Sequence, residues 1–448
     1  MGGGYTGLWT AYFLTETDPG VSVAVLEADI CGGGPSGRNG GFVTGWWDDL
    51  PDLIELYGEE RALDACRAVS DSIAAIGEWC DRHGVDAWFT RGGYVSVSAS
   101  PAQDVAPVAA VRMARLLGVG DEYVSLSSHE VAARCRSTAF RGGSFMRDGA
   151  TVQPARLARG LRRVLLERGV RVFERTPVTA LRGGPPVSLR TPHGDVRADQ
   201  GVLAINAWAS AIPAFRRSIV AWGSHIVLTA PAPDRLREMG WTDGEAITDF
   251  RSAVHYFRTT PDGRVAFGGG GGRSALRIGL GRRLAADPPS IRRAAEGLRR
   301  LLPAFRDVPL EEAWGGPIDV SGSHLPFFLT SAPGTIHLGA GYSGNGVAPG
   351  HLGGRILAAL ALGRDDPVTR LPMVHADPVR FPPEPVRTIG AHLVREAVIR
   401  KERADDADRR VGPLVALLAT LPRRLGYHWG PDPRTRAVSE GLNPWLTS

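Results

Sequence analysis

The chain has 448 residues, of which 43% are apolar and 22% charged, enough for the core of one large two-lobed unit or of two to three domains. Its formal net charge is +5, but acidic residues accompany the arginines almost everywhere, so we expect no nucleic-acid partner. Four cysteines without a C-x-x-C pair argue against a metal site and fit a reducing cytoplasm. Without a signal peptide or an apolar run of about 18 residues, we expect a cytoplasmic protein with no membrane span.

The first motif is a glycine-rich turn at residues 2–7 (GGGYTG) with the spacing G-x-G-x-x-G. Such a turn links a buried strand to a helix and brings backbone N–H groups close to a pyrophosphate, although a glycine-rich coil is the competing interpretation. An apolar helix over 8–14 and a strand over 21–27 follow, and the strand ends in Glu27 at the spacing of a ribose-binding carboxylate. The chain as printed shows no apolar strand before Gly2, so we expect the first strand of the nucleotide-binding sheet to be missing.

Helical and strand patterns alternate through the next part of the chain. Apolar residues spaced three and four apart predict the helices, and short β-branched runs predict the strands. This alternation indicates βαβ units with an inserted meander. The predicted helices cover 50–84, 106–117, 128–134 and 154–167, and the predicted strands cover 94–97, 170–173 and 201–207.

From residue 220 to residue 267 the pattern changes to antiparallel strands. Strands are predicted over 222–229, 255–259 and 264–267, and the turn at 261–263 joins the last two as a hairpin. We therefore expect a second lobe built on a mostly antiparallel sheet. A helix over 290–302 follows, and the Pro- and Arg-rich last part of the chain contains one amphipathic helix over 392–403.

Two further glycine-rich segments resemble ligand loops. Residues 36–41 (SGRNGG) follow the glycine turn 32–34, and their small side chains let the backbone lie flat against a planar or phosphorylated ligand. Residues 339–349 (GAGYSGNGVAP) lie between a predicted strand, 335–338, and a predicted helix, 351–362, where a loop can bind an anion. The competing interpretations are a flexible surface loop and a tight strand–helix turn.

Together these motifs resemble the D-amino-acid oxidase superfamily of flavin-dependent amine oxidoreductases, which includes glycine, sarcosine and γ-glutamylputrescine oxidases. The resemblance spans residues 2–365 and is specific for the superfamily rather than for a substrate. The segments that carry it are GGGYTG (2–7), LEA (26–28), SGRNGG (36–41), RTPVTAL (175–181), WGGPID (314–319) and GYSGNGV (341–347).

The resemblance implies an α/β fold in which a Rossmann-like FAD-binding domain carries an inserted, mostly antiparallel substrate domain. FAD is expected to be non-covalent, because no cysteine follows Cys135. The expected domains are 1–80, 145–219 and 325–365 for FAD, 81–144 and 220–324 for substrate, and 366–448 as a C-terminal extension. The expected FAD contacts are Gly2, Gly4, Tyr5, Thr6, Gly7, Glu27, Ala28, Ser36, Gly37, Arg38, Asn39, Gly40, Gly41, Val178, Gly341, Tyr342, Ser343, Gly344, Asn345, Gly346 and Val347.

The resemblance also implies a reaction, in which the CH–NH bond of an amine or amino acid is oxidised to an imine by hydride transfer to flavin N5. Candidate substrate-pocket residues are Arg258, His255, Tyr256 and His324, each of which could equally be a sheet-surface or core residue. Trp46 and Trp47 could wall the pocket, although core packing is the more common role of tryptophan.

Three hypotheses about function stay open at this point. The first is a general amine or amino-acid oxidoreductase, and the second is an aminophosphonate- or γ-glutamylputrescine-type oxidase with the same chemistry. The third is a flavin-deficient pseudoenzyme that lacks its first strand. Some relatives use a lysine in the oxygen reaction, but Lys401 is the only lysine here, so the electron acceptor is O2 or another molecule.

Overall fold

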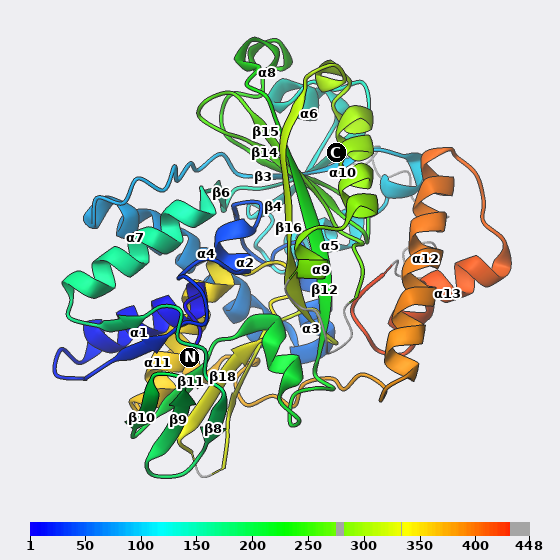
Figure 1. Ribbon diagram of the computed structural model, residues 1–448. Coiled ribbons are helices and arrows are strands. Elements are labelled where there is room, and N and C mark those ends of the chain that lie inside the picture. Colours follow the sequence, from blue (N-terminus) through cyan, green and yellow to red (C-terminus); the bar gives the residue numbers. More distant parts are fainter. Residues whose placement is uncertain (275–281, 333, 431–448) are drawn as a thin grey trace.

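The computed structural model describes residues 1–274, 282–332 and 334–430, and Figure 1 shows their arrangement. The N-terminal helix α1 (Tyr5–Thr17) is apolar on nearly every side, which suits a helix buried all round. It packs along α11 (Ala348–Ala361) and against α7 (Pro154–Glu167). The predicted helices at 8–14, 154–167 and 351–362 are confirmed.

Two small sheets stand beside these helices. In one, β1 (Ala24–Leu26) pairs in parallel with β7 (Arg171–Phe173); in the other, β18 (Ile336–Ala340) lies between β11 (Gly201–Leu203) and β17 (Phe327–Thr330). The first two residues connect the sheets, because Gly2 N donates to Leu26 O at 2.8 Å and the Met1 amino group donates to Val202 O at 2.8 Å.

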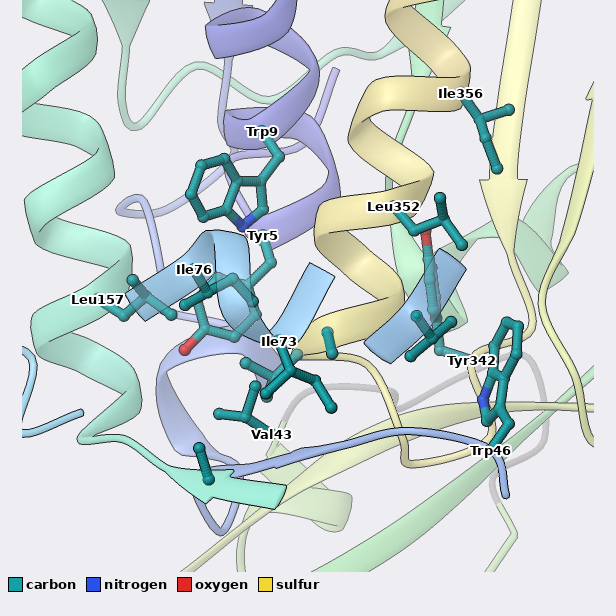
Figure 2. Packing of buried hydrophobic residues seen from close by; sticks show 14 of the residues in the cluster. Tyr5, Trp9, Val43, Trp46, Ile73, Ile76, Leu157, Tyr342, Leu352 and Ile356 are labelled. Carbon is teal, nitrogen blue, oxygen red and sulfur yellow. The ribbon is translucent and has the colours of Figure 1, made fainter. Parts of the chain in front are cut away.

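The helical stretch predicted over 50–84 is two helices, α3 (Leu50–Tyr57) and α4 (Glu59–Arg82). Gly58, whose φ is +82°, divides them, because a left-handed residue ends a helix. The apolar face of α4 and the buried side of α1 form the core of this lobe. Figure 2 shows Ile73 and Ile76 of α4 facing Trp9 and Tyr5 of α1, with Leu157 of α7 beside them.

The second lobe contains an eight-stranded sheet with the order β16-β12-β15-β14-β13-β3-β5-β4. Neighbouring strands are antiparallel except for β13 and β3, and β14 and β15 form the hairpin predicted around 261–263. The strands are β3 (Tyr94–Ser98), β4 (Tyr123–Leu126), β5 (Gly142–Met146), β12 (Ile219–Thr229), β13 (Ala246–Asp249), β14 (His255–Thr259), β15 (Val265–Gly269) and β16 (Leu310–Ser321).

The remaining elements connect and cover the two lobes. They are α2 (Pro35–Arg38), β2 (Phe42–Thr44), α5 (Val108–Leu116), α6 (Ser128–Arg134), β6 (Gly149–Thr151), β8 (Ala180–Arg182), β9 (Val187–Thr191), β10 (Gly194–Ala198), α8 (Pro233–Met239), α9 (Arg282–Ala285) and α10 (Pro288–Leu301). Among the helices that the structure describes, none is both long and apolar enough to cross a bilayer.

The eight-stranded sheet has two different faces, because side chains alternate along each strand. One face is apolar and packs on α10, where Phe257, Phe267 and Leu298 are buried. The other face carries polar and aromatic side chains that are only half-buried, including Tyr256 and Ser224. This second face turns toward the glycine loops of the first lobe.

Over its described part, residues 366–430, the C-terminal extension contains two α-helices rather than one. The predicted helix 392–403 lies inside the longer α12 (Val386–Asp406), and α13 (Pro413–Arg424) was not predicted. The two helices pack on each other, and α12 is anchored to the second lobe, because Glu402 Oε1 accepts a 2.9 Å hydrogen bond from Ala253 N. In Figure 1 this pair stands beside α10.

Candidate functional site

The carboxylate of Glu27 lies at the end of β1, where the sequence places a ribose. Its Oε2 accepts from Gly3 N at 2.6 Å and its Oε1 accepts from Asp29 N at 2.8 Å. Each oxygen keeps acceptor capacity, because an ionised carboxylate offers about four lone-pair sites. Glu27 is thus oriented by the backbone and can accept from a pair of ribose hydroxyls.

The segment 175–178 runs along the same end of β1. Arg175 N donates to Asp29 O at 2.7 Å, and Thr176 N donates to Glu27 O at 2.8 Å. Val178 follows, and its main-chain N–H and C=O have no hydrogen-bond partner among the residues that the structure describes. These groups are therefore free to bind a ligand, and the expected contact of Val178 with FAD stays a prediction.

The glycines of the first turn have different roles. Gly2 has φ +101°, and a Cβ there would lie 2.2 Å from Ala204 O; a Cβ on Gly7 would lie 2.0 Å from Gly2 O. Chain packing alone therefore requires both. Gly4 begins α1 and has no side chain to cap it; Ser36 Oγ accepts from Tyr5 N, and the N–H groups of Thr6 and Gly7 in the first helical turn remain for a pyrophosphate.

The second glycine segment joins the first turn. Ser36 Oγ accepts from Tyr5 N at 2.9 Å, and a Cβ on Gly34 would meet no atom within 4 Å. The segment was expected to lie flat, but residues 35–38 form a helical turn, α2. The side chain of Asn39 closes that turn, because its Nδ2 donates to Ser36 O at 2.9 Å and its Oδ1 accepts from Gly41 N at 2.7 Å.

The third glycine loop is held from below by Asp319, a fully buried residue of β16. Its Oδ2 accepts from Gly341 N at 2.6 Å, and its main-chain O accepts from Ser343 N at 2.9 Å. Its Oδ1 accepts from Asn206 Nδ2 at 2.8 Å. Burial raises the pKa of Asp319 to about 7, although the N–H groups of the loop act in the opposite direction.

This loop also contacts the other glycine segments. Tyr342 OH accepts from Thr6 Oγ1 at 2.8 Å, and Asn345 Nδ2 donates to Gly45 O at 3.2 Å. The helix α11 then begins without a side-chain cap, and the nearest atoms to a Cβ on Gly344 or Gly346 lie 3.5 Å or more away. The loop thus presents open backbone to a ligand.

The features described above indicate whether the residues of this chain can hold FAD. The protein provides an oriented acid at the ribose position, a first turn of α1 with N–H groups left over for the pyrophosphate, and a helix without a side-chain cap, α11, where an isoalloxazine would lie. A Cβ on Gly34 would meet no atom within 4 Å, and a Cβ on Gly344 or Gly346 would make only ordinary van der Waals contacts, with Ile318 and Tyr342. The residues present therefore fit the cofactor.

The polar face of the sheet stands opposite these loops. Tyr256 OH lies 2.7 Å from Ser224 Oγ, and burial raises the pKa of Tyr256 to about 12. Arg258, 5% exposed, donates from Nε to Gly40 O at 2.6 Å and forms no ion pair with any described residue. Trp314 Nε1 donates to Arg38 O at 2.8 Å. Hydrogen bonds therefore join the sheet to the SGRNGG segment.

The other two candidate pocket residues lie elsewhere. His255 belongs to the opposite face of the sheet, where its Nδ1 lies 2.7 Å from Asp249 Oδ2, so the structure does not bring it to Tyr256 and Arg258. His324 lies near Asp52 and Arg423, and burial lowers its pKa to about 4. Its place is at the junction with the C-terminal extension.

The two tryptophans after the SGRNGG segment are core residues. Both are 2% exposed, and Trp47 Nε1 donates to Ser70 Oγ at 3.0 Å. Figure 2 shows Trp46 near Tyr342 of the third glycine loop. Sequence reasoning did not single out Asp319 or Ser224. Asp319 ends the WGGPID segment, whereas Ser224 has no distinguishing signal in its strand.

Among the described residues, no group of three or more His, Cys, Asp or Glu side chains is arranged to hold a metal ion. All four cysteines are buried and free, and burial raises the pKa of Cys31, beside the first turn, to about 12. A thiol with so high a pKa is a poor nucleophile.

Glycine loops of this kind, facing an antiparallel sheet, define a flavin-dependent oxidoreductase. The chain belongs to the family of FAD-dependent oxidoreductases, whose model matches residues 1–360. FAD is therefore its cofactor.

Curated relatives and solved structures agree with this assignment. The chain is 30% identical over 374 residues to a probable oxidoreductase OrdL of Rhizobium meliloti (81% of this chain, 82% of the relative). It is 28% identical over 381 residues to the γ-glutamylputrescine oxidoreductase of Escherichia coli (83% and 85%). The crystal structure of glycine oxidase from Geobacillus kaustophilus has a similar fold, with a TM-score of 0.68 at 19% identity over 84% of this chain and 97% of that one.

We predict that Glu27→Ala weakens FAD binding about ten- to a hundredfold, because a charge-assisted acceptor is worth about 1.5–3 kcal/mol. Titration of apoprotein with FAD, followed by flavin fluorescence, measures the affinity. Glu16→Ala is the matched control, because Glu16 pairs with Arg168 on the surface of the first lobe. Equal FAD affinities in wild type and Glu27→Ala would contradict the assignment.

The raised pKa of Asp319 predicts a pH dependence. The pKa of Asp319 in the folded protein exceeds its ordinary value of 3.8. Protonation of this carboxyl therefore stabilises the fold fully below pH 3.8, and this stabilisation is lost as the pH rises to about 7. Asp319→Asn should remove this contribution to the slope of the free energy of unfolding against pH, which is up to about 1.4 kcal/mol per pH unit. The urea midpoints of both proteins between about pH 4.5 and about pH 7 measure it.

The exposed Asp121→Asn serves as the control and should keep the wild-type slope. Parallel pH profiles for wild type and Asp319→Asn would show that Asp319 stays ionised throughout this range.

Proposed function

We propose that this protein oxidises the CH–NH bond of a primary or secondary amine or amino acid to an imine. FAD, when bound, supplies the two-electron acceptor for the hydride that leaves the substrate carbon. The observation that carries the proposal is the polar sheet face opposite the third glycine loop, where Tyr256 and Ser224 are half-buried and Arg258 is a buried cation. The names of the curated relatives support the same chemistry.

The chain's own residues would act mainly by binding and orientation. The hydroxyl pair Tyr256–Ser224 offers a donor and an acceptor to a neutral amine. The Tyr256 phenol stays protonated at neutral pH, because burial raises its pKa to about 12. Arg258 holds Gly40 in place, and burial lowers its pKa only to about 10, so a positive charge stays beside the cofactor loop.

The third glycine loop supplies the remaining electrostatics. The first turn of α11 has no side-chain cap, so its N–H groups and the positive end of the helix favour negative charge beside the loop. The N–H groups of this turn would thereby stabilise negative charge on a cofactor bound beside them. Asp319 fixes Gly341 at the beginning of the loop and so acts as a positioning residue.

A γ-glutamylputrescine-type substrate is the second candidate, because the curated relative of that name covers most of this chain. The electron acceptor is O2 or another oxidant. We also propose the domain division 1–80, 145–219 and 325–365 for FAD against 81–144 and 220–324 for substrate, with 366–448 as an extension.

The direct test is anaerobic mixing of the FAD-loaded protein with a panel of amines, amino acids, aminophosphonates and γ-glutamylputrescine. We expect at least one amine to bleach the flavin absorption near about 450 nm. If none does, the amine proposal fails and the pseudoenzyme hypothesis gains support.

Gly346→Ala is predicted to slow this bleaching far more than it lowers the melting temperature. An added Cβ meets only Tyr342, at 3.5 Å, so the fold tolerates it. The proposal sets this loop against the flavin, where an added methyl group would disturb the fit of the ring. Gly344 is a poorer choice, because its φ of +97° makes any side chain strained. The rate of flavin reduction in a stopped-flow instrument and the melting temperature are measured for wild type and variant. Lost stability with an unchanged rate would indicate a purely structural turn.

A further inference from the structure

The segment after α13 turns from the C-terminal extension toward the polar face of the sheet. One contact from the end of α13 and one within the segment hold it there. Arg423, in the last turn of α13, forms a two-fold ion pair with Asp52 of α3, at 2.7 and 2.9 Å. His428 N donates to Gly322 O at 2.9 Å, one residue beyond the end of β16. The segment is thereby tied to both lobes.

Trp429 follows directly and packs on Trp222 of β12, with ring centroids 5.7 Å apart. Trp222 lies two residues from Ser224 and therefore on the same face of the strand, the face that also carries Tyr256. An aromatic ring of the C-terminal extension thus belongs to the polar face opposite the cofactor loops.

Contacts continue from Trp222 to the third glycine loop. Trp222 is paired with Ile318 of β16, and Ile318 Cδ1 is the nearest atom, at 3.6 Å, to a Cβ built on Gly344. Trp429, Trp222 and Ile318 therefore form a continuous line from the extension to the loop. Their combined surface is almost wholly apolar.

Open space lies next to this line. Gly316 is paired with Ser224, and a Cβ on Gly316 would meet no atom within 4 Å. Along β16, Gly316 and Ile318 are half-buried, whereas Gly315 and Pro317 on the opposite face are buried. The half-buried row thus borders the space between sheet and glycine loop, and Trp429 stands at one end of it.

We propose that Trp429, together with Trp222, forms the end wall of the substrate space and limits the length of the amine that this enzyme accepts. The matching end of the substrate, distal to the oxidised C–N bond, is mainly apolar, because the faces of two indole rings form the wall. This inference rests on the proposed amine oxidation. Trp429 lies beyond residue 360, where the match to the family model ends, so this wall belongs to the chain's own extension.

The test compares wild type, Trp429→Ala and Trp429→Phe on straight-chain primary amines of increasing length. Removing the ring should raise kcat/KM for long amines relative to short ones by about tenfold or more, the effect of space for at least one methylene. Trp429→Phe keeps a ring and should stay close to wild type. Leu425→Ala, at a 60% exposed position in the same segment, should leave the length preference unchanged.

A second measurement does not need turnover. Iodide quenching of the bound FAD's fluorescence should be stronger in Trp429→Ala than in wild type or Leu425→Ala, because the space loses a wall. An unchanged length preference together with unchanged quenching would overturn the inference. If no amine reduces the wild-type flavin but quenching is stronger in Trp429→Ala, the position of Trp429 as a wall is supported and the proposed amine oxidation fails. Should Trp429→Ala lose FAD, Trp429→Leu takes its place in both measurements.

Discussion

The site depends on the register of the eight-stranded sheet. Because side chains alternate along a strand, the pairing that buries Phe257 and Phe267 against α10 also turns Tyr256 and Arg258 toward the cofactor loops. A shift of one residue would exchange the two sets and remove the polar face. Burial of the large apolar side chains, each worth about 1.5–3 kcal/mol, holds this register and with it the chemistry.

The glycine loops depend on a second, smaller constraint. An open loop must be held by contacts that leave its ligand side free, and here those contacts come from the strand β16 and from side chains that join one glycine segment to its neighbours. Asp319 binds Gly341 from the strand below, Asn345 reaches back to Gly45, and Thr6 bonds Tyr342 across the two glycine segments. The loops therefore stay in place without side chains that would occupy the approach of the cofactor.

Much of the local structure around the candidate cofactor site was predictable from the sequence, because glycine spacing is a local signal. The turn at 2–7, the acid Glu27 and the loop before α11 lie where the pattern placed them. The hairpin after β14 was predictable for the same reason. The helical stretch 50–84 was predicted as a whole, but its division depends on the single left-handed residue Gly58.

The substrate side was not predictable to the same extent, because it depends on which face each strand buries. His255 and Tyr256 are neighbours in sequence, yet the sheet places them on opposite faces. Helix α13 was missed; Pro422 lies inside its last turn, directly before Arg423 and Arg424. Trp429 meets Trp222 only through folding across about two hundred residues of chain, a contact that no local pattern indicates.

The central claim is that the space between the third glycine loop and the polar sheet face holds the reactive ring of FAD. A crystal structure of the FAD-loaded protein tests it most directly. We expect the isoalloxazine to lie between residues 341–346 and the side chains of Tyr256, Ser224 and Ile318, and the ribose to lie on Glu27. Electron density for the ring on the α10 side of the sheet, or anywhere away from both loops, would contradict it.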